Sequence, residues 1–338
     1  MPIPKINDNL VERLEAKLKI KHNTARSYAS NIRGLWRKLN KDKPFGGSLS
    51  FVPTRKMMRI VAEITNLSAR KNAANAAVAA LKVLGKHEKE MTEYRQLMMG
   101  ADQDFQAYLK AGKKKFPFKD GEKEWRKVRD LYKKVARVAS AHNLWKRGEH
   151  IKYAGYRTLM ALLYLKWIAL VPVRRLEYVD TRLITAAAYR ALTDVERKKG
   201  NWLVTGKKWT WELWNYKTIK TFGHQTLPIP LALKNTLRKI QPLAEAKNAQ
   251  GYIFLNSKWG PLNRNLFSIF IKEVFKKYLN KSYTQNTIRA IRVSSVWGKS
   301  VKTLDALELS ENMGHSISTQ LLHYRQNQND KVSEDKDE

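Results

Sequence analysis

The chain has 338 residues, no cysteine, and 65 Lys and Arg against 30 Asp and Glu, which gives a formal net charge of +35. Apolar residues make up 43% of it, enough for packed cores, so a disordered basic tail protein is not expected. The missing cysteines exclude disulfides, thiolate zinc sites and cysteine nucleophiles. A soluble chain tolerates such positive self-repulsion most readily when its partner is a polyanion, so nucleic acid is the leading candidate, with a ribosome or a membrane surface as the alternative.

A membrane-spanning segment is not expected. No run of about 18 apolar residues occurs. The longest apolar stretch, around Leu159 to Val173, is interrupted by Lys166. The N-terminus also lacks the apolar core of a secretory signal.

The first hundred residues predict a bundle of helices. Leu10, Leu14 and Leu18 recur every four positions and form an apolar stripe. Asn23-Thr24 is typical of a cap before the next helix, which is expected from Ala25 to Leu39. Further helices are expected over 54–66, 69–85 and 88–111.

The helical pattern breaks between Ala111 and Gly121, where three consecutive lysines adjoin a proline and two glycines. This composition predicts an interdomain linker, although a solvated loop inside one domain would have a similar sequence. We therefore predict a helical domain over 1–112, a basic linker over 113–121, a second domain over 122–332 and a polar tail over 333–338.

The second domain begins with helices, and the spacing of its apolar residues then changes from a helical to a strand-like pattern. Residues 202–204, 209–214 and 226–230 are rich in β-formers and predict a small antiparallel sheet. Helices return over 231–246, 264–279, 284–299 and 303–311, and again around Tyr324. The expected fold class is mainly α with a small antiparallel β-sheet, that is α+β.

The most informative motif is Met313-Gly314-His315, with Tyr324 nine positions after the histidine. It resembles the C-terminal motif of the tyrosine recombinases, the family of phage and chromosome-resolving integrases. In that family the tyrosine is the nucleophile that cuts DNA, and the histidine helps to hold the phosphate. Considered singly, a core histidine and a packing tyrosine are the simpler interpretation. The order of the motifs upstream favours the resemblance.

The segment Val171 to Glu177 follows the apolar helix, where the family carries a Gly-x-Arg-x-x-Glu pattern. Arg174 takes the place of the first catalytic arginine, and Glu177 that of the glutamate that supports it. Pro172 stands where a glycine is usual. Arginine suits phosphate because its fork grips two oxygens and keeps its charge.

Two lysines are candidates for the general acid that the family places on a β-hairpin. Lys217, in the segment Asn215 to Thr221, is the first choice, and Lys220 is the reserve. In a chain so rich in lysine, most lysines are solvated surface charges.

The third motif departs from the family's His-x-x-Arg. The preferred register is Asn286-Thr287-Ile288-Arg289, in which Arg289 is the second arginine and Asn286 replaces the histidine. Asparagine can hydrogen-bond a phosphate but cannot act as a base near neutral pH. An alternative register makes Arg292 the catalytic arginine.

The resemblance covers residues 8 to 326 and implies a mechanism. Tyr324 would attack a scissile phosphate and form a 3′-phosphotyrosine link. Neither a nucleotide cofactor nor a metal would be required. The implied partner is double-stranded DNA, clamped by an N-terminal core-binding domain and bound by a homotetramer on paired sites, with no membrane and no small-molecule substrate. The protein would act inside the cell wherever its DNA lies, in a nucleus or in a prokaryotic cytoplasm, and the composition suits a mobile element or a virus.

Three alternatives remain open. A hairpin telomere resolvase and a topoisomerase IB-like enzyme would use the same residues. A recombinase-derived DNA-binding protein without catalytic activity would fit the Asn286 substitution, whereas the retained tyrosine, arginines and lysine favour an enzyme.

Overall fold

A computed structural model of the chain describes residues 9–41, 43–110, 116–247, 250–297 and 303–324. The chain divides into two compact units, Met1–Lys113 and Lys114–Glu338, and the division falls within the stretch that we assigned to the linker. Residues 113–115 of that linker and the predicted tail over 333–338 lie outside the described residues. No helix in the described ranges is long and apolar enough to cross a membrane.

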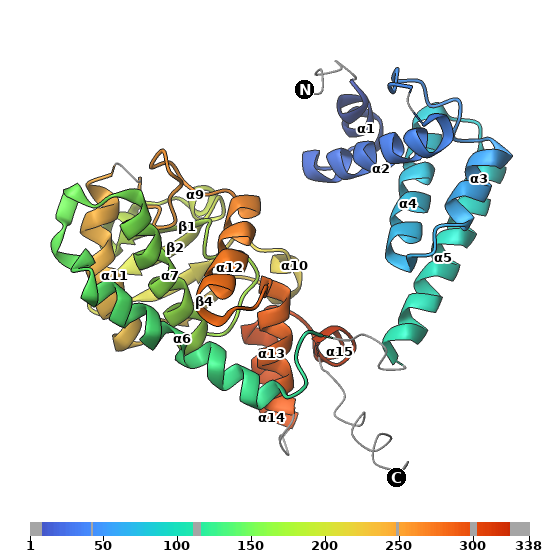
Figure 1. Cartoon of the computed structure of the whole chain (residues 1–338). Helices are drawn as coiled ribbons and strands as arrows, with labels where there is room; N and C mark the ends of the chain where they lie inside the picture. The colour runs from blue at the N-terminus through green and yellow to red at the C-terminus, as the bar shows by residue number, and fades with distance from the viewer. Residues whose placement is uncertain (1–8, 42, 111–115, 248–249, 298–302, 325–338) are drawn as a thin grey trace, which may run out of the picture. The chain divides into compact units, whose positions relative to one another are not determined.

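The described part of the first unit is helical (Figure 1). Its helices are α1 Leu10–Leu18, α2 His22–Asn40, α3 Arg55–Ala62, α4 Leu67–Leu84 and α5 Glu88–Lys110. Six alanines of α4 between Ala73 and Ala80 are buried, which lets neighbouring helices approach it closely. The predicted cap at Asn23-Thr24 was wrong, because α2 already begins at His22, whose Nδ1 lies 2.6 Å from Glu15 of α1.

The second unit begins with a long helical layer and a small sheet. Its elements, in chain order, are α6 Gly121–Ala141, the 3₁₀ turns η1 Leu144–Lys146 and η2 Gly148–His150, α7 Tyr153–Leu170, β1 Thr181–Thr185, α8 Ala186–Ala191, α9 Asp194–Arg197, β2 Asn201–Thr205, β3 Thr210–Leu213, α10 Ile219–Phe222 and β4 Gln225–Pro228. The chain continues with α11 Leu231–Glu245, α12 Arg264–Leu279, α13 Gln285–Trp297, α14 Thr303–Asn312, α15 Ile317–Thr319 and the π-helical turn η3 Gln320–Tyr324.

The prediction of a mainly helical chain with a small sheet is confirmed, but the sheet is mixed rather than antiparallel. Its order is β1-β2-β3-β4, in which β1 runs parallel to β2 and the other pairs are antiparallel. A parallel pair needs a crossover connection, and residues 186–200, which include α8 and α9, supply it.

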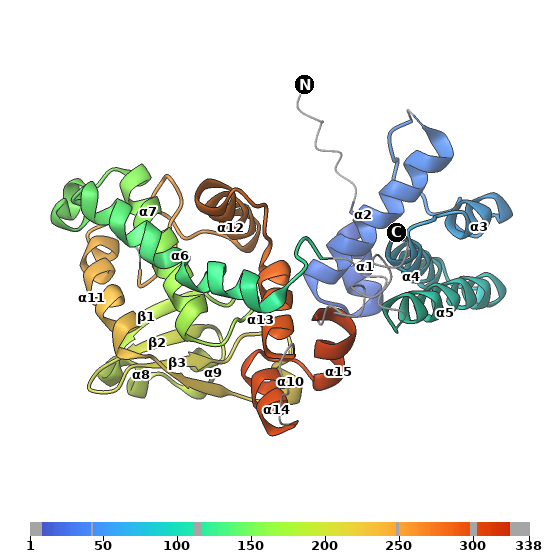
Figure 2. The same cartoon turned by 60° about the horizontal axis from the view of Figure 1, so that its bottom comes forward.

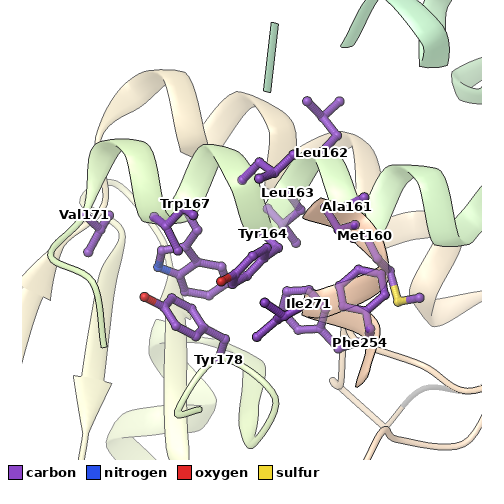
Figure 3. Packing of buried hydrophobic residues seen from close by; sticks show 14 of the residues in the cluster. Met160, Ala161, Leu162, Leu163, Tyr164, Trp167, Val171, Tyr178, Phe254 and Ile271 are labelled. Carbon is purple, nitrogen blue, oxygen red and sulfur yellow. The ribbon is translucent and has the colours of Figure 1, made fainter. Parts of the chain in front are cut away.

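Helix α7 lies over the sheet (Figure 2), and an aromatic core joins the two (Figure 3). Trp167 of α7 lies 4.8 Å, centroid to centroid, from Trp211 of β3, and both are fully buried. Tyr178, just before β1, packs edge-on against Trp167 and Tyr164. This packing fixes the segment between α7 and β1, which contains Arg174.

Helix α13 is held closely against α6. A Cβ built on Gly121, the first residue of α6, would lie 2.6 Å from the Cβ of Ser294, so only glycine allows this approach. Helices α10, α13, α14 and α15 gather at one end of the second unit in both views.

Candidate active site

Tyr324 lies against α13 at the end of η3. The Nε of Arg289 donates a hydrogen bond to the Tyr324 hydroxyl at 3.3 Å, and the guanidinium lies 5.1 Å from the ring centroid. The hydroxyl of Ser294, also on α13, donates to the Tyr324 carbonyl at 3.2 Å. Helix α13 therefore holds both the backbone and the hydroxyl of this tyrosine.

Arg289 is fully buried and ties together three segments. Its Nη1 donates to the carbonyls of Val173 at 2.8 Å and Met313 at 3.0 Å. Its Nη2 is buried and has no hydrogen-bond partner among the described residues. One nitrogen of this guanidinium is thus left for a ligand.

Arg174 is the second buried guanidinium of the site. Its Nη1 donates to Gln225 Oε1 at 2.7 Å and to the Asn312 carbonyl at 2.8 Å. The ring of Tyr216 lies 4.7 Å from the guanidinium carbon. These contacts come from β4, from the end of α14 and from the loop after β3, so the guanidinium is fixed in place.

The Gly314-His315 pair fits between these arginines and the tyrosine. Gly314 has a φ of +67°, and a Cβ there would lie 3.0 Å from Nη2 of Arg174, so glycine is required. The ring of His315 stacks on that of Tyr324 with centroids 5.1 Å apart. His315 is 2% exposed, and neither ring nitrogen has a hydrogen-bond partner in the described ranges.

Lys217 and Lys220 are exposed in the connection between β3 and β4. The residues on either side of Lys217 both contact the site: Tyr216 packs on Arg174, and Thr218 Oγ1 donates to the Gly314 carbonyl at 2.9 Å. The backbone at Lys217 is therefore anchored beside the buried arginines. Lys220 lies one helical turn further along, in α10.

Helix α13 distinguishes the two registers proposed for the third motif. Arg289 contacts Tyr324, whereas the guanidinium of Arg292 lies 5.0 Å from the ring centroid of Trp125 on α6. Asn286 is exposed, and among the described residues its side chain makes no hydrogen bond. Its buried neighbour Gln285 donates from Nε2 to the Arg174 carbonyl at 2.5 Å.

Among the described residues, neither buried guanidinium forms an ion pair: no carboxylate lies within ion-pair distance of Arg174 or Arg289. Glu177 is buried and its charge acts on both arginines, but its Oε2 has no hydrogen-bond partner. Burial lowers the pKa of both guanidiniums, and their mutual repulsion lowers that of Arg174 further. Because an uncompensated buried charge is costly, the arrangement favours an anionic ligand.

Neighbouring positive charges, Arg289 and Arg175, act on both the tyrosine and the histidine. Burial alone would raise the pKa of Tyr324, but Arg289 and Arg175 outweigh it and the net pKa is lowered. Burial, together with Arg289, lowers the pKa of His315 to about 3. Near neutral pH the histidine is therefore an uncharged ring, while the tyrosine loses its proton more easily than in water.

Residues of this arrangement that were not predicted from the sequence include Gln225, Gln285 and Arg175, whose charge acts on Tyr324. A lone glutamine in a strand or at a helix start has no pattern to distinguish it. In the described ranges there is also no group of three or more His, Asp or Glu side chains that could hold a metal ion. No protein-family model matches this chain, and no curated protein matches it.

Proposed function

We propose that this protein is a tyrosine recombinase-like enzyme that cuts and rejoins DNA strands through Tyr324. The observation that supports this most is the pair of buried guanidiniums, Arg174 and Arg289, without ion-pairing carboxylates beside a tyrosine hydroxyl. A phosphodiester supplies the missing anion. A nucleophile in contact with an arginine that grips phosphate is what phosphoryl transfer to tyrosine requires.

In the proposed step, the Tyr324 hydroxyl gives its proton to solvent water and its oxygen attacks the phosphorus. A P–O(Tyr) bond forms and the bond to the 5′ oxygen breaks. Lys217 gives a proton to that leaving oxygen. Arg174 and Arg289 stabilise the charge on the non-bridging oxygens, and His315, as a neutral ring, offers one further hydrogen bond. Attack by a 5′ hydroxyl on the phosphotyrosine reverses the step and rejoins the strand.

The proposal also assigns a role to each of the two units. The first unit would be the core-binding domain that clamps duplex DNA, and the second unit would be the catalytic domain. With a net charge of +35, DNA affinity would depend strongly on phosphate contacts and would fall steeply with salt. Action as a tetramer on two paired sites would complete the assembly.

The test is covalent trapping. Duplexes retained by the protein from a random library would supply a binding site, and nicked versions of that site would then be incubated with it. We expect a covalent protein–DNA adduct on a denaturing gel with wild type and with Tyr132→Phe, a tyrosine of α6 that packs beside Lys166. No adduct is expected with Tyr324→Phe.

The general acid can be assigned with a substrate whose 5′ bridging oxygen is replaced by sulfur. A thiolate leaves without a proton, so this substrate should restore cleavage by a variant that lacks the acid. We expect restoration for Lys217→Ala and none for Lys220→Ala, which should cleave ordinary DNA normally.

A second candidate is a DNA-binding protein that has lost catalysis. The exposed Asn286, which cannot act as a base, favours it. Tight binding to a selected site without any adduct would support this candidate over the enzyme. Among enzymes, joining of two sites would indicate a recombinase, closed hairpin ends a telomere resolvase, and relaxation without a specific site a topoisomerase.

A further inference from the structure

Gln225, the first residue of β4, makes two hydrogen bonds that link separate parts of the site. Its Oε1 accepts from Arg174 Nη1 at 2.7 Å, and its Nε2 donates to the Glu311 carbonyl at 3.0 Å. Glu311 lies in the last turn of α14, directly before the Met313-Gly314-His315 segment. A single amide thus joins the sheet, the buried arginine and the segment that ends in His315.

Gln225 and Arg174 both donate to the end of α14. The last carbonyls of a helix have no N–H donor within the helix, and here Arg174 donates to that of Asn312, while Gln225 shares that of Glu311 with the Gly314 N–H, which donates at 2.9 Å. Arg174 is 1% exposed, so water cannot replace a lost contact easily. The register of the β3–β4 pair, in which Leu213 lies opposite Gln225, sets the position of the amide.

The chemical type of this side chain also matters. A carboxylate at position 225 would pair with Arg174 and cancel much of its charge. An amide accepts the same hydrogen bond and leaves the positive charge for a ligand. Glu177, the carboxylate that the sequence assigned to this support, makes no ion pair with Arg174.

We propose that Gln225 is the positioning residue of Arg174: it orients the guanidinium toward the scissile phosphate and couples it to the segment that carries His315. This inference rests on the proposed function. Gln225 itself does not touch the reacting atoms. It acts through Arg174, so its removal should matter only while Arg174 is present.

The experiment is a double-mutant cycle on single-turnover cleavage of the nicked site at saturating DNA. Gln225→Leu should slow cleavage by about 10- to 100-fold with DNA affinity little changed, the usual effect of a displaced catalytic group. In an Arg174→Ala background the same substitution should add almost nothing. The matched control is Gln241→Leu, a half-buried glutamine of α11 whose side chain bonds only Glu245 among the described residues, and it should cleave like wild type.

A substrate with a methylphosphonate at the scissile position supplies an independent readout. It carries no negative charge on that phosphorus, so it depends less on Arg174. Gln225→Leu and Gln225→Glu should both lose much less activity on it than on the phosphodiester. Equal losses on both substrates, or multiplicative losses with Arg174→Ala, would show that Gln225 only maintains the fold and would overturn the inference.

Melting temperatures of the four proteins in the mutant cycle test this inference separately from the proposed function. These proteins are wild type, Gln225→Leu, Arg174→Ala and the double variant. If Gln225 holds Arg174, the double variant should melt no lower than the less stable single variant. If wild type binds its site yet forms no adduct, the proposed enzymatic function is wrong. The melting temperatures of the four proteins would then decide whether Gln225 and Arg174 are coupled. Additive thermal shifts in that case would overturn the coupling as well.

Discussion

Two groups of buried charges in the second unit are built in opposite ways. Glu124 of α6 is 5% exposed, and its Oε1 accepts from Tyr283 at 2.8 Å and from Lys281 at 3.0 Å, while Lys127 lies 3.4 Å from Oε2. Arg174 and Arg289 are buried as deeply. Among the described residues, however, the hydrogen bonds of their guanidiniums go only to carbonyls, an amide and a hydroxyl, and each guanidinium lies against a tyrosine ring.

The difference separates a structural group from a candidate site. The charge of Glu124 is balanced within the protein, so this group needs no ligand and serves to join α6 to the segment between α12 and α13. The charges of the two arginines are not balanced. Proteins tolerate the free-energy cost of burying unpaired charge mainly at functional sites, where a ligand of opposite charge can neutralise it.

Removing one of the two unpaired charges tests this difference most directly. Arg289→Leu should slow cleavage by about 10²- to 10³-fold, the usual cost of losing one donor to a developing negative charge. Its melting temperature should change little, because the desolvation cost disappears together with the hydrogen bonds. The matched control is Arg292→Leu, which alters a guanidinium packed on Trp125 and should cleave nearly normally. The reverse pattern would establish the alternative register.

Crowding Arg174 should have a smaller effect. Gly314→Ala places a Cβ at 3.0 Å from Nη2 of Arg174 on a backbone with φ of +67°, so either the arginine or the backbone must move. We expect single-turnover cleavage to fall by about 10- to 100-fold, as for other small displacements of catalytic groups. Gly34→Ala is the control, because its Cβ meets nothing within 4 Å. Unchanged cleavage by Gly314→Ala would show that the Gly-His turn does not position Arg174.

How far the sequence predicts this molecule depends on how local the determinants are. Helix α12, predicted over 264–279, has those bounds, because its apolar period and its Asn263 cap lie within one segment. Strand β1 was not predicted. Its residues Thr181–Thr185 do not alternate, and they form a strand by pairing with β2 across a connection of fifteen residues, 186–200.

The same rule holds within the candidate site. Arg174, Arg289, His315 and Tyr324 were selected from motif spacing, and the structure places them in one connected cluster. Gln225 was not selected, because its importance depends on β4 lying beside the last carbonyls of α14. Such contacts between distant segments leave no periodic trace in a sequence.

Breaking the balanced group should affect stability rather than chemistry. Glu124→Leu leaves the buried hydroxyl of Tyr283 without its acceptor, which should lower the free energy of unfolding by about 1–3 kcal/mol. Glu124→Gln keeps an acceptor for Tyr283 and should cost less. Denaturant unfolding of both variants measures this, and single-turnover cleavage should stay within a few-fold of wild type. A large loss of cleavage by well-folded Glu124→Gln would mean that this group also belongs to the site.

The smallest expected effect is a difference in how the two groups make the free energy of unfolding depend on pH. Burial lowers the pKa of His315 to about 3, whereas an unfolded histidine titrates near pH 6.5. Below that pH the unfolded chain binds a proton that the folded chain does not. His315 should therefore reduce stability as pH falls from about 6.5 toward 3, by at most about 1.4 kcal/mol per pH unit.

Glu124 behaves differently. Burial would raise its pKa, but Tyr283 and Lys281 outweigh burial and lower it, so its contribution is lost only as pH falls below its ordinary value of 4.5.

Unfolding free energies measured between pH 7 and pH 5 separate the histidine from Glu124, because Glu124 is largely ionised in both states there. His315→Phe should flatten the slope in that window, and Glu124→Gln should leave it unchanged. A slope that His315→Phe leaves intact would mean that His315 binds its proton at the same pH in the folded and unfolded chains, so that the folded ring is protonated at pH 5. In that case a third positive charge would stand beside Arg174 and Arg289, and the deficit of negative charge would be larger, not smaller.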